Sequence, residues 1–318
     1  MTSLMNMEAT GSLITFNIDG KPLEKLIDVV SKGIGTIYQP RKIRKEADAQ
    51  AYAIKVLEKA KAVATSETKL IEAETAERIG KRIVAQEIKR QNNIDDIVEA
   101  AAEELKGKQV SEDPVDEDWA TRFFGIVQDV SREEMKVLWS KILAKEIDRP
   151  SSFSMRTLDT LKNLSVTEAE LFQKVAPYIL HQNDFFLYYD TDVLAKYNIH
   201  YTDLAQLTEC GLLQSGTFVS KNYYSKPDSD SISGIITGKY VVLMNIPRGS
   251  NNVSIPVIIL SKTGSELFCL LEPETNIEYI KDLSQHVKRE NPQAIMQYSE
   301  LISVEDKQIR YKKTVKDL

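Results

Sequence analysis

The chain has 318 residues, of which 42% are hydrophobic and 28% are charged, and its formal net charge is -6. These values are typical of a soluble globular protein with two or three domains, and the acidic balance argues against a chain that binds nucleic acid along its whole length. No run of about 18 apolar residues occurs, so we expect no ordinary transmembrane helix. The start lacks the basic and apolar regions of a signal peptide, and the two cysteines are too few for a disulfide framework. We therefore expect a cytoplasmic protein.

The first 40 residues predict a short strand followed by an amphipathic helix. The strand covers residues 12–19, and the helix starts near Pro22, which suits a first helical turn. Gly33 and Gly35 are expected to weaken the end of the helix, and Pro40 closes it. Its apolar face combines Leu23, Leu26, Ile27, Val30 and Ile34.

Residues 41–107 predict a long helix, rich in alanine and charge, and a helix after it. From Arg41 to about Arg90 there is one glycine and no proline, so a continuous helix would be roughly 75 Å long. Asn93 is a good N-cap for the second helix, and Gly107 stops it. Whether residues 41–90 form one helix or a hairpin stays open. The first part carries an apolar seam with heptad-like spacing, made of Ile43, Ala47, Ile54 and Leu57.

This seam is too narrow to stabilise an isolated helix of that length. We therefore expect it to pair with a helix of the same chain or with another copy, as in a coiled-coil homo-oligomer.

A basic cluster of Arg41, Lys42, Arg44 and Lys45 begins the long helix. Cations at a helix N-terminus oppose the macrodipole, so the cluster favours an external anion. That anion is an anionic membrane surface, which would make the protein peripheral to the inner membrane, or nucleic acid, or the acids of a neighbouring subunit. The alternative is that the cluster has no ligand and that its side chains are simply exposed to solvent at the start of the helix.

Residues 117–181 predict a compact helical domain after a polar linker at 106–118. Capping patterns of the type S-x-x-E or T-x-x-E at Ser131 and Thr167 predict two of its helix starts. Large apolar side chains recur at helical spacing and predict a real core, formed by Trp119, Phe123, Ile126, Val127, Leu138, Trp139, Ile142 and Leu143.

Residues 183–274 predict a winged-helix-like α+β module. A helix ends at Gly211, two strands at 239–247 and 253–261 are joined by a polar loop into a hairpin, and a helix follows. This region carries more acids than bases, so we expect it to contact protein rather than DNA. Residues 275–318 predict a helix and two strands. The expected fold class is mainly α with a smaller α+β part: a long N-terminal helix or helical hairpin, a compact helical unit and the winged-helix-like module.

No motif predicts a reaction. The three histidines, His181, His200 and His286, are isolated in sequence, and the metal-binding, G-x-S-x-G, Walker A and G-x-G-x-x-G patterns are absent. A nuclease of scattered carboxylates would need side chains that converge only in the folded protein. We therefore assign no catalytic, cofactor-binding or metal-binding residue and expect a non-enzymatic protein.

Four segments carry a resemblance to a known family: "KLIDVVSKGIGTIYQPRKIRKEADAQAYA", "RQNNIDDIVEAA", "DEDWATRFFGIVQDVSREEMKVLWSKILAKEI" and "SFSMRTLDTLKNLS". They resemble an uncharacterised bacterial and prophage family known only as a domain of unknown function. More remotely, the layout is similar to Abi-alpha-type abortive-infection proteins, with the turn "LSKTGSELF" in the C-terminal half. The resemblance implies a bacterial accessory protein concerned with phage, and it transfers no catalytic residue.

The expected function is that of a non-enzymatic, oligomerising protein of an anti-phage defence or prophage locus, with a possible partner protein from the same locus. The alternative is a nucleic-acid-associated protein that uses the basic helix start and the winged-helix-like module. A cryptic hydrolase is a third class.

Overall fold

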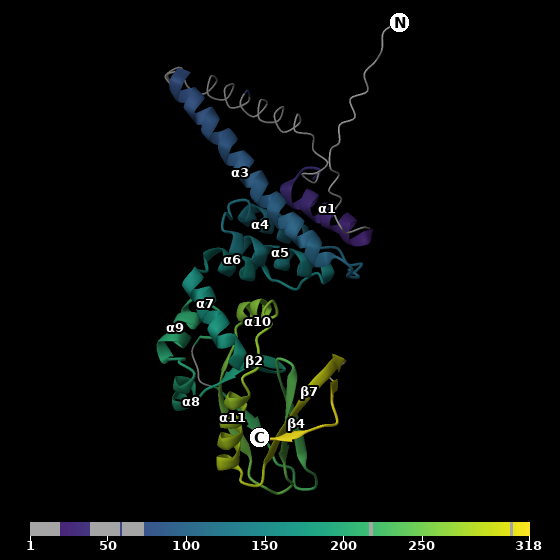
Figure 1. Cartoon of the computed structure of the whole chain (residues 1–318), viewed down its shortest axis with the longest axis vertical. Coiled ribbons are helices and arrows are strands. Elements are labelled where there is room, and N and C mark those ends of the chain that lie inside the picture. The colour runs from purple at the N-terminus through teal and green to yellow at the C-terminus, as the bar shows by residue number, and fades with distance from the viewer. Residues whose placement is uncertain (1–19, 39–57, 59–72, 216–218, 306–307) are drawn as a thin grey trace, which may run out of the picture. The chain divides into compact units, whose positions relative to one another are not determined.

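The structure is a computed structural model that describes residues 20–38, 58, 73–215, 219–305 and 308–318. The chain divides into two compact units, Met1–Met155 and Arg156–Leu318, called the N-terminal unit and the C-terminal unit below. Figure 1 shows the helices of the first and the sheet of the second. None of the described helices is both long enough and apolar enough to cross a membrane.

The described part of the N-terminal unit consists of helices around an aromatic core. The helices are α1 (Lys21–Ile34), α3 (Ala73–Leu105), α4 (Glu117–Val127) and α5 (Glu133–Asp148). Helix α1 packs mainly on α4, and α5 packs mainly on α3. The ring of Phe123 stacks on Trp119 at 5.0 Å and meets the edge of Trp139 at 5.5 Å between centroids. These contacts form the apolar core that the sequence predicts for this region.

Helix α1 confirms the predicted helix but corrects the interpretation of one glycine. Pro22 lies in its first turn, and Gly35 ends it in the left-handed conformation with φ 70°. Gly33 lies against α4, where a Cβ atom would come within 2.3 Å of Phe124 Cδ2 and 2.8 Å of the Ala120 carbonyl oxygen. Gly33 therefore permits the close approach of two helices rather than weakening a helix end.

Helix α3 runs without a break through the position where the sequence predicts a new helix. Asn93 is buried inside α3, and its Nδ2 donates to the carbonyl oxygen of Gln128 at 2.8 Å. The predicted N-cap is therefore wrong, because the side-chain amide of Asn93 makes a tertiary hydrogen bond instead of capping a helix. Gly107, with φ 71°, follows the end of the helix as expected. The predicted strand at 12–19 and residues 41–57 lie outside the described residues.

The C-terminal unit contains short helices and one large sheet. Its helices are α6 (Met155–Asn163, which starts at the unit boundary), α7 (Val166–Val175), η1 (Ala176–Tyr178), α8 (Thr191–Lys196), α9 (Tyr201–Glu209), α10 (Lys262–Phe268) and α11 (Ile277–Glu290). Its strands are β1 (Ile179–Gln182), β2 (Asp184–Tyr188), β3 (Val219–Tyr223), β4 (Ser231–Thr237), β5 (Tyr240–Ile246), β6 (Val253–Ile259), β7 (Ile295–Glu305), β8 (Gln308–Tyr311) and β9 (Lys316–Asp317).

Two helix starts differ from the predicted capping patterns. Helix α5 begins at Glu133 after Arg132, and its N-cap makes no side-chain hydrogen bond, so Ser131 does not cap it. Helix α7 is capped two residues earlier than predicted, by a reciprocal pair in which Ser165 and Glu168 each accept from the other's backbone amide. The helices expected within 117–181 are all present, and the boundary between the units lies inside this range.

The predicted fold class is wrong because the C-terminal unit is built on a nine-stranded antiparallel sheet, not on a winged helix. The strand order is β3-β6-β2-β1-β4-β5-β7-β8, and β9 also pairs with β7. Both predicted strands at 239–261 exist, as β5 and β6, but they do not pair with each other. Strand β5 pairs with β4 and β7, whereas β6 pairs with β2 and β3.

A tight turn explains the pairing of β4 with β5. Thr237 and Tyr240 are register partners, which leaves a two-residue loop that starts at Gly238 with φ 50°. A glycine with positive φ at this position is typical of the turns that join two antiparallel strands. Thr275 Oγ1 lies too close to Gly238 to leave room for a Cβ atom there, and it donates to the carbonyl oxygen of Thr237 at 2.8 Å. The segment before α11 is thereby fastened to this turn.

Candidate functional site

A hollow lined by tyrosine and lysine lies where β5, β7 and the last residues of the chain meet. Its volume is about 210 Å³, and we call it the tyrosine–lysine pocket. Its lining comprises Tyr240, Tyr298, Ser299, Glu300, Lys312, Thr314 and Lys316.

The register of two strands brings the tyrosines together. Tyr240 lies opposite Glu300, and Val242 lies opposite Tyr298, so these four side chains share one face of the sheet. The two tyrosine rings are diagonal neighbours, with centroids 5.7 Å apart and planes inclined by 74°. Because residues 240 and 298 belong to strands far apart in sequence, the pocket is invisible to local patterns.

The lysines give the pocket a cationic rim. Lys316 Nζ lies 5.8 Å from the centre of the Tyr298 ring, a cation–π arrangement, and no ion pair with a described carboxylate is recorded for it. Lys312 pairs with Glu300. The hydrogen bond and the charge of Lys312, with the charge of Lys316, lower the pKa of Glu300. Glu300 is therefore anionic at neutral pH and pairs with Lys312, whereas Lys316 Nζ lies beside the Tyr298 ring.

Hydrogen bonds fasten the outer wall of the pocket to β7. The buried Ser299 Oγ lies 2.7 Å from the carbonyl oxygen of Lys312 and 2.9 Å from that of Thr314. The backbone N–H of Lys312 donates to the carbonyl oxygen of Glu300 at 2.9 Å. Gln297 Nε2 donates to Asp317 Oδ1 at 2.9 Å. The wall is thus positioned by the strand that carries Tyr298.

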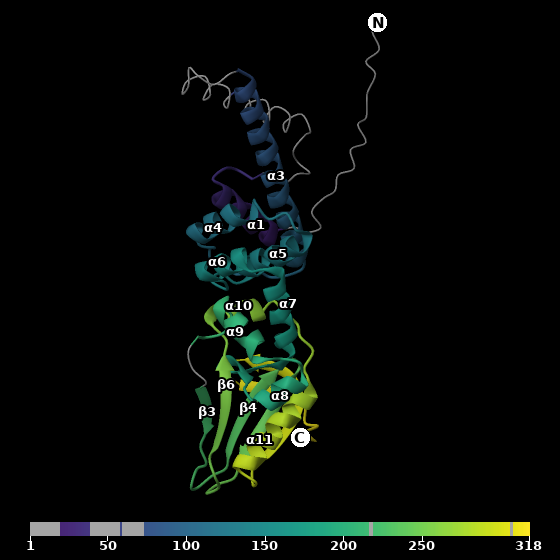
Figure 2. The ribbon, with the colours of Figure 1, turned by 90° about the vertical axis from the view of Figure 1, so that its left-hand side faces the viewer.

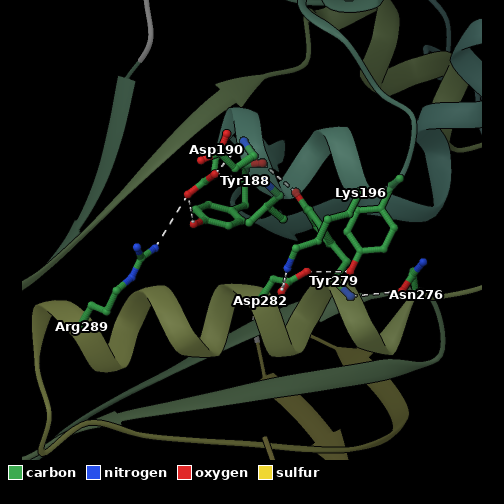
Figure 3. A network of polar contacts seen from close by, with 10 residues as sticks. Tyr188, Asp190, Lys196, Asn276, Tyr279, Asp282 and Arg289 are labelled. Atoms are coloured by element: carbon green, nitrogen blue, oxygen red, sulfur yellow. Dashed lines mark hydrogen bonds and ion pairs between the residues drawn. The ribbon is translucent and has the colours of Figure 1, made fainter.

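Helix α11 lies along the sheet (Figure 2) and is fixed there by a polar network (Figure 3). The Tyr279 hydroxyl donates to the carbonyl oxygen of Tyr188 at 2.8 Å. Asp282 accepts from Lys196 Nζ at 2.6 Å and from the Tyr197 hydroxyl at 2.7 Å. These contacts join α11 to the end of β2 and to α8.

The electrostatics of this network favour its hydrogen bonds. Burial raises the pKa of Tyr279 well above its ordinary value, and burial together with the Asp282 carboxylate raises the pKa of Tyr197. Both hydroxyls are therefore protonated donors at neutral pH. Every group in the network is matched with a partner from the same unit, so we interpret it as a structural lock and not as a reactive site.

A second hollow, of about 360 Å³, lies among α6, α7 and α9. It contains Arg156 with three carboxylates, and beside them the Cys210 thiol. Burial raises the pKa of that thiol, and the nearby Glu168 and Glu209 raise it further. A thiol with a raised pKa is a poor nucleophile, so this hollow does not indicate cysteine chemistry.

The histidines do not form a site together. His181 stacks on Phe185 at 4.4 Å, and its pKa is lowered, chiefly by burial. His200 lies at the start of α9, and His286 Nε2 lies 3.0 Å from the carbonyl oxygen of Ser254. Among the residues that the structure describes, no group of three or more potential metal ligands gathers.

The predicted site residues lie outside the described ranges. This holds for the basic cluster, Arg41, Lys42, Arg44 and Lys45, and for the seam, Ile43, Ala47, Ile54 and Leu57. Sequence reasoning missed the tyrosine–lysine pocket. The nearest local signal is the run of Tyr311, Lys312 and Lys313 in "QIRYKKTV", after the predicted strand that contains Tyr298, and it does not indicate Tyr240 or Lys316.

Comparison with known proteins identifies a family without a known activity. The profile of a family described as "Protein of unknown function (DUF2806)" matches residues 77–284. The match includes Tyr240 and ends within α11, before Tyr298. Searches of curated proteins and of solved structures each found no match. Since the matched range covers more than half of the sequence, the chain belongs to the DUF2806 family, as the resemblance to a domain of unknown function predicted.

Proposed function

We propose that this protein is a non-enzymatic binding protein whose C-terminal unit binds single-stranded nucleic acid in the tyrosine–lysine pocket. The observation that carries the proposal is the pairing of two tyrosine rings with lysines around one hollow of about 210 Å³. Aromatic rings stack on bases of any sequence, and lysines neutralise the phosphates that connect them. A hollow of this size accepts an unpaired base, which favours a single strand over a duplex.

The pocket supplies the two kinds of contact with different residues. Tyr298 presents its ring to the pocket, where a stacked base contributes about 1–3 kcal/mol by alanine substitution in comparable sites. Lys316 presents an ammonium group next to the same ring. Stacking and phosphate contact can therefore be separated by substitution.

The proposal is tested by fluorescence anisotropy with labelled single-stranded DNA of 20 thymidines at low salt. We expect Tyr298→Ala and Lys316→Gln each to weaken binding by about tenfold, and Tyr298→Phe to retain it, because the ring is kept. Tyr224→Ala is the matched control, since Tyr224 is an exposed tyrosine of the same unit outside the pocket. Equal affinities for the pocket variants and the control, or no binding by the wild-type chain, would show that the proposal is wrong.

The wider role that we propose is that of a cytoplasmic, oligomerising accessory protein of a bacterial anti-phage or prophage locus. Its support is the apolar seam of residues 43–57 and the resemblance to abortive-infection proteins. We also propose that the protein binds a partner protein from the same locus and an anionic membrane surface. Light scattering at micromolar concentration tests it: we expect a homo-oligomer, and a monomer would contradict self-assembly.

A further inference from the structure

The N-terminal half of α3 has a face that no described helix covers. Figure 1 shows this half extending away from α1, α4 and α5, which pack near the other end of the helix. Among the residues 75 and 78–92, whose side chains the structure describes, the exposed ones are Arg78, Lys81, Arg82, Ala85, Gln86, Ile88, Lys89 and Asn92. None of these residues is acidic.

Three of these cations form a line. At 3.6 residues per turn, Arg78, Arg82 and Lys89 point within about 40° of one another, and at about 1.5 Å per residue they span roughly 16 Å of the helix. The small side chain of Ala85 lies between them on the same face. We call these three side chains the cationic line.

Among the residues that the structure describes, no carboxylate pairs with the cationic line, whereas the neighbouring Arg90 is paired. Arg78 Nη2 donates to the Thr75 hydroxyl at 3.1 Å, and no ion pair with a described residue is recorded for Arg82 or Lys89. The residue after Lys89, Arg90, pairs with Asp129 at 2.9 Å and with Glu87 at 3.1 Å. Described acids of the unit therefore pair with Arg90, and neither of these pairs includes Arg82 or Lys89.

The charges of α3 are also segregated along its length. Its last 13 residues, 93–105, carry five acids and no base: Asp95, Asp96, Glu99, Glu103 and Glu104. Acids in a last turn interact unfavourably with the helix macrodipole, so this order does not serve the stability of the helix itself. The preceding residues, 73–92, carry five bases and three acids, so the excess of positive charge lies toward the N-terminal end of α3, where a ligand of negative charge can contact it.

We propose that the cationic line is a docking surface for the sugar–phosphate backbone of nucleic acid, independent of base identity. Arginine and lysine in a row along a helix match phosphates repeated along a strand, and such contacts position a protein without reading sequence. Ile88 is the one large apolar side chain among the exposed residues of this half, which leaves little to insert into a membrane. The proposal goes beyond the tyrosine–lysine pocket, since it concerns another unit and needs no unpaired base.

The experiment uses the full chain and a 20-bp DNA duplex of arbitrary sequence. The triple variant Arg78→Gln, Arg82→Gln, Lys89→Gln is compared with a control that removes the same charge from exposed cations of the same unit, Lys106→Gln, Lys108→Gln, Arg132→Gln. Each phosphate contact contributes a slope of about 0.9 to the fall of log K with log salt for duplex DNA. We expect the cationic-line variant to lose about two to three units of slope and at least tenfold in affinity at low salt, and the control to lose less than one unit.

Three further measurements make the outcome decisive. Circular dichroism checks the helicity of each variant, and the single variant Arg82→Gln, expected to lose about one unit of slope, replaces the triple variant if that unfolds. Inorganic polyphosphate should compete with the duplex, because it presents phosphates without bases. Equal slopes for variant and control, or flotation with phosphatidylserine vesicles in place of duplex binding, would overturn the proposal. The single-strand assay with Tyr298→Ala reports on the pocket and the duplex assay with the cationic-line variant reports on α3, so failure of the pocket and failure of the cationic line are distinguishable.

Discussion

The two units are stabilised by different kinds of contact. In the N-terminal unit the centre is a cluster of aromatic rings, and the indole N–H groups of Trp119 and Trp139 have no hydrogen-bond partner among the described residues. These side chains contribute through volume and burial. In the C-terminal unit α11 is fixed to the sheet by hydrogen bonds from Tyr279 and to Asp282. Substitutions that shorten a buried side chain should therefore destabilise the N-terminal unit most. Substitutions that remove a single hydrogen-bonding group should destabilise the C-terminal unit most.

The two units also differ in whether their charged side chains are paired within the unit. The carboxylates of the C-terminal lock are used internally, and Glu300 holds Lys312 at the pocket. On α3 the cationic line is free of such partners among the described residues, whereas Arg90 is paired. Unpaired cations on a surface are the ones that an anionic ligand can use without first breaking an ion pair.

Removal of the largest buried ring in the N-terminal unit should have the largest effect. Trp139 is fully buried, so Trp139→Ala should lower the free energy of unfolding by about 3–5 kcal/mol, while Trp139→Phe should cost less because it leaves a smaller cavity. Urea unfolding followed by circular dichroism measures both. A loss below about 1 kcal/mol for the alanine variant would contradict an aromatic core.

Removal of the central carboxylate of the lock should come next. Asp282→Ala deletes the acceptor of two hydrogen bonds, one of them from a lysine, and should cost about 2–3 kcal/mol. Asp228→Ala, in the exposed segment between β3 and β4, is the control and should change the free energy of unfolding by less than about 0.5 kcal/mol. If the two variants unfold alike, α11 is not held by this carboxylate.

The sequence predicts elements of the N-terminal unit well because their signals are local. The apolar spacing of Leu26 and Val30 and the glycine at 35 are enough to define α1. Asn93 misleads because an N-cap side chain and a buried tertiary donor are the same residue type. Only the position of Gln128, brought near by the packing of α4, distinguishes them.

The architecture of the C-terminal unit depends on pairings that local patterns do not contain. The strands β5 and β6 were both predicted, but β6 pairs with β2, which lies about 70 residues earlier and was not predicted as a strand. The candidate site depends on the same kind of information. Tyr240 and Tyr298 meet through the register of β5 with β7, and Lys316 joins them through a short edge strand.

Removal of one hydroxyl from the lock should have a smaller effect than removal of its carboxylate. Tyr279→Phe keeps the ring against Tyr178 and Tyr188 and deletes the bond to the Tyr188 carbonyl oxygen. Because this carbonyl lies in a buried place, we expect a loss of about 1–1.5 kcal/mol in the free energy of unfolding. Tyr201→Phe, at an exposed tyrosine, is the control. Equal stability of the two variants would mean that the hydrogen bond of the Tyr279 hydroxyl does not contribute to the free energy of unfolding.

The ion pair in the last turn of α11 should contribute least to the free energy of unfolding. Arg289 Nη2 lies 3.8 Å from Asp190 Oδ2, and the arginine side chain is 68% exposed, so Arg289→Ala should cost less than about 1 kcal/mol at pH 7. Burial acts to raise the pKa of Asp190, but hydrogen bonds from the amides of Val193 and Asp192, with smaller contributions from Tyr188 and Arg289, lower it overall.

A carboxylate whose pKa is lowered by folding stabilises the protein above its unfolded pKa of about 3.9, and this contribution is lost as the pH falls through the folded value. The difference between the wild-type chain and Arg289→Ala should therefore be constant from pH 7 to about pH 5 and shrink at lower pH. Urea midpoints across this range measure it. A difference that grows on acidification would place the arginine's main contact elsewhere.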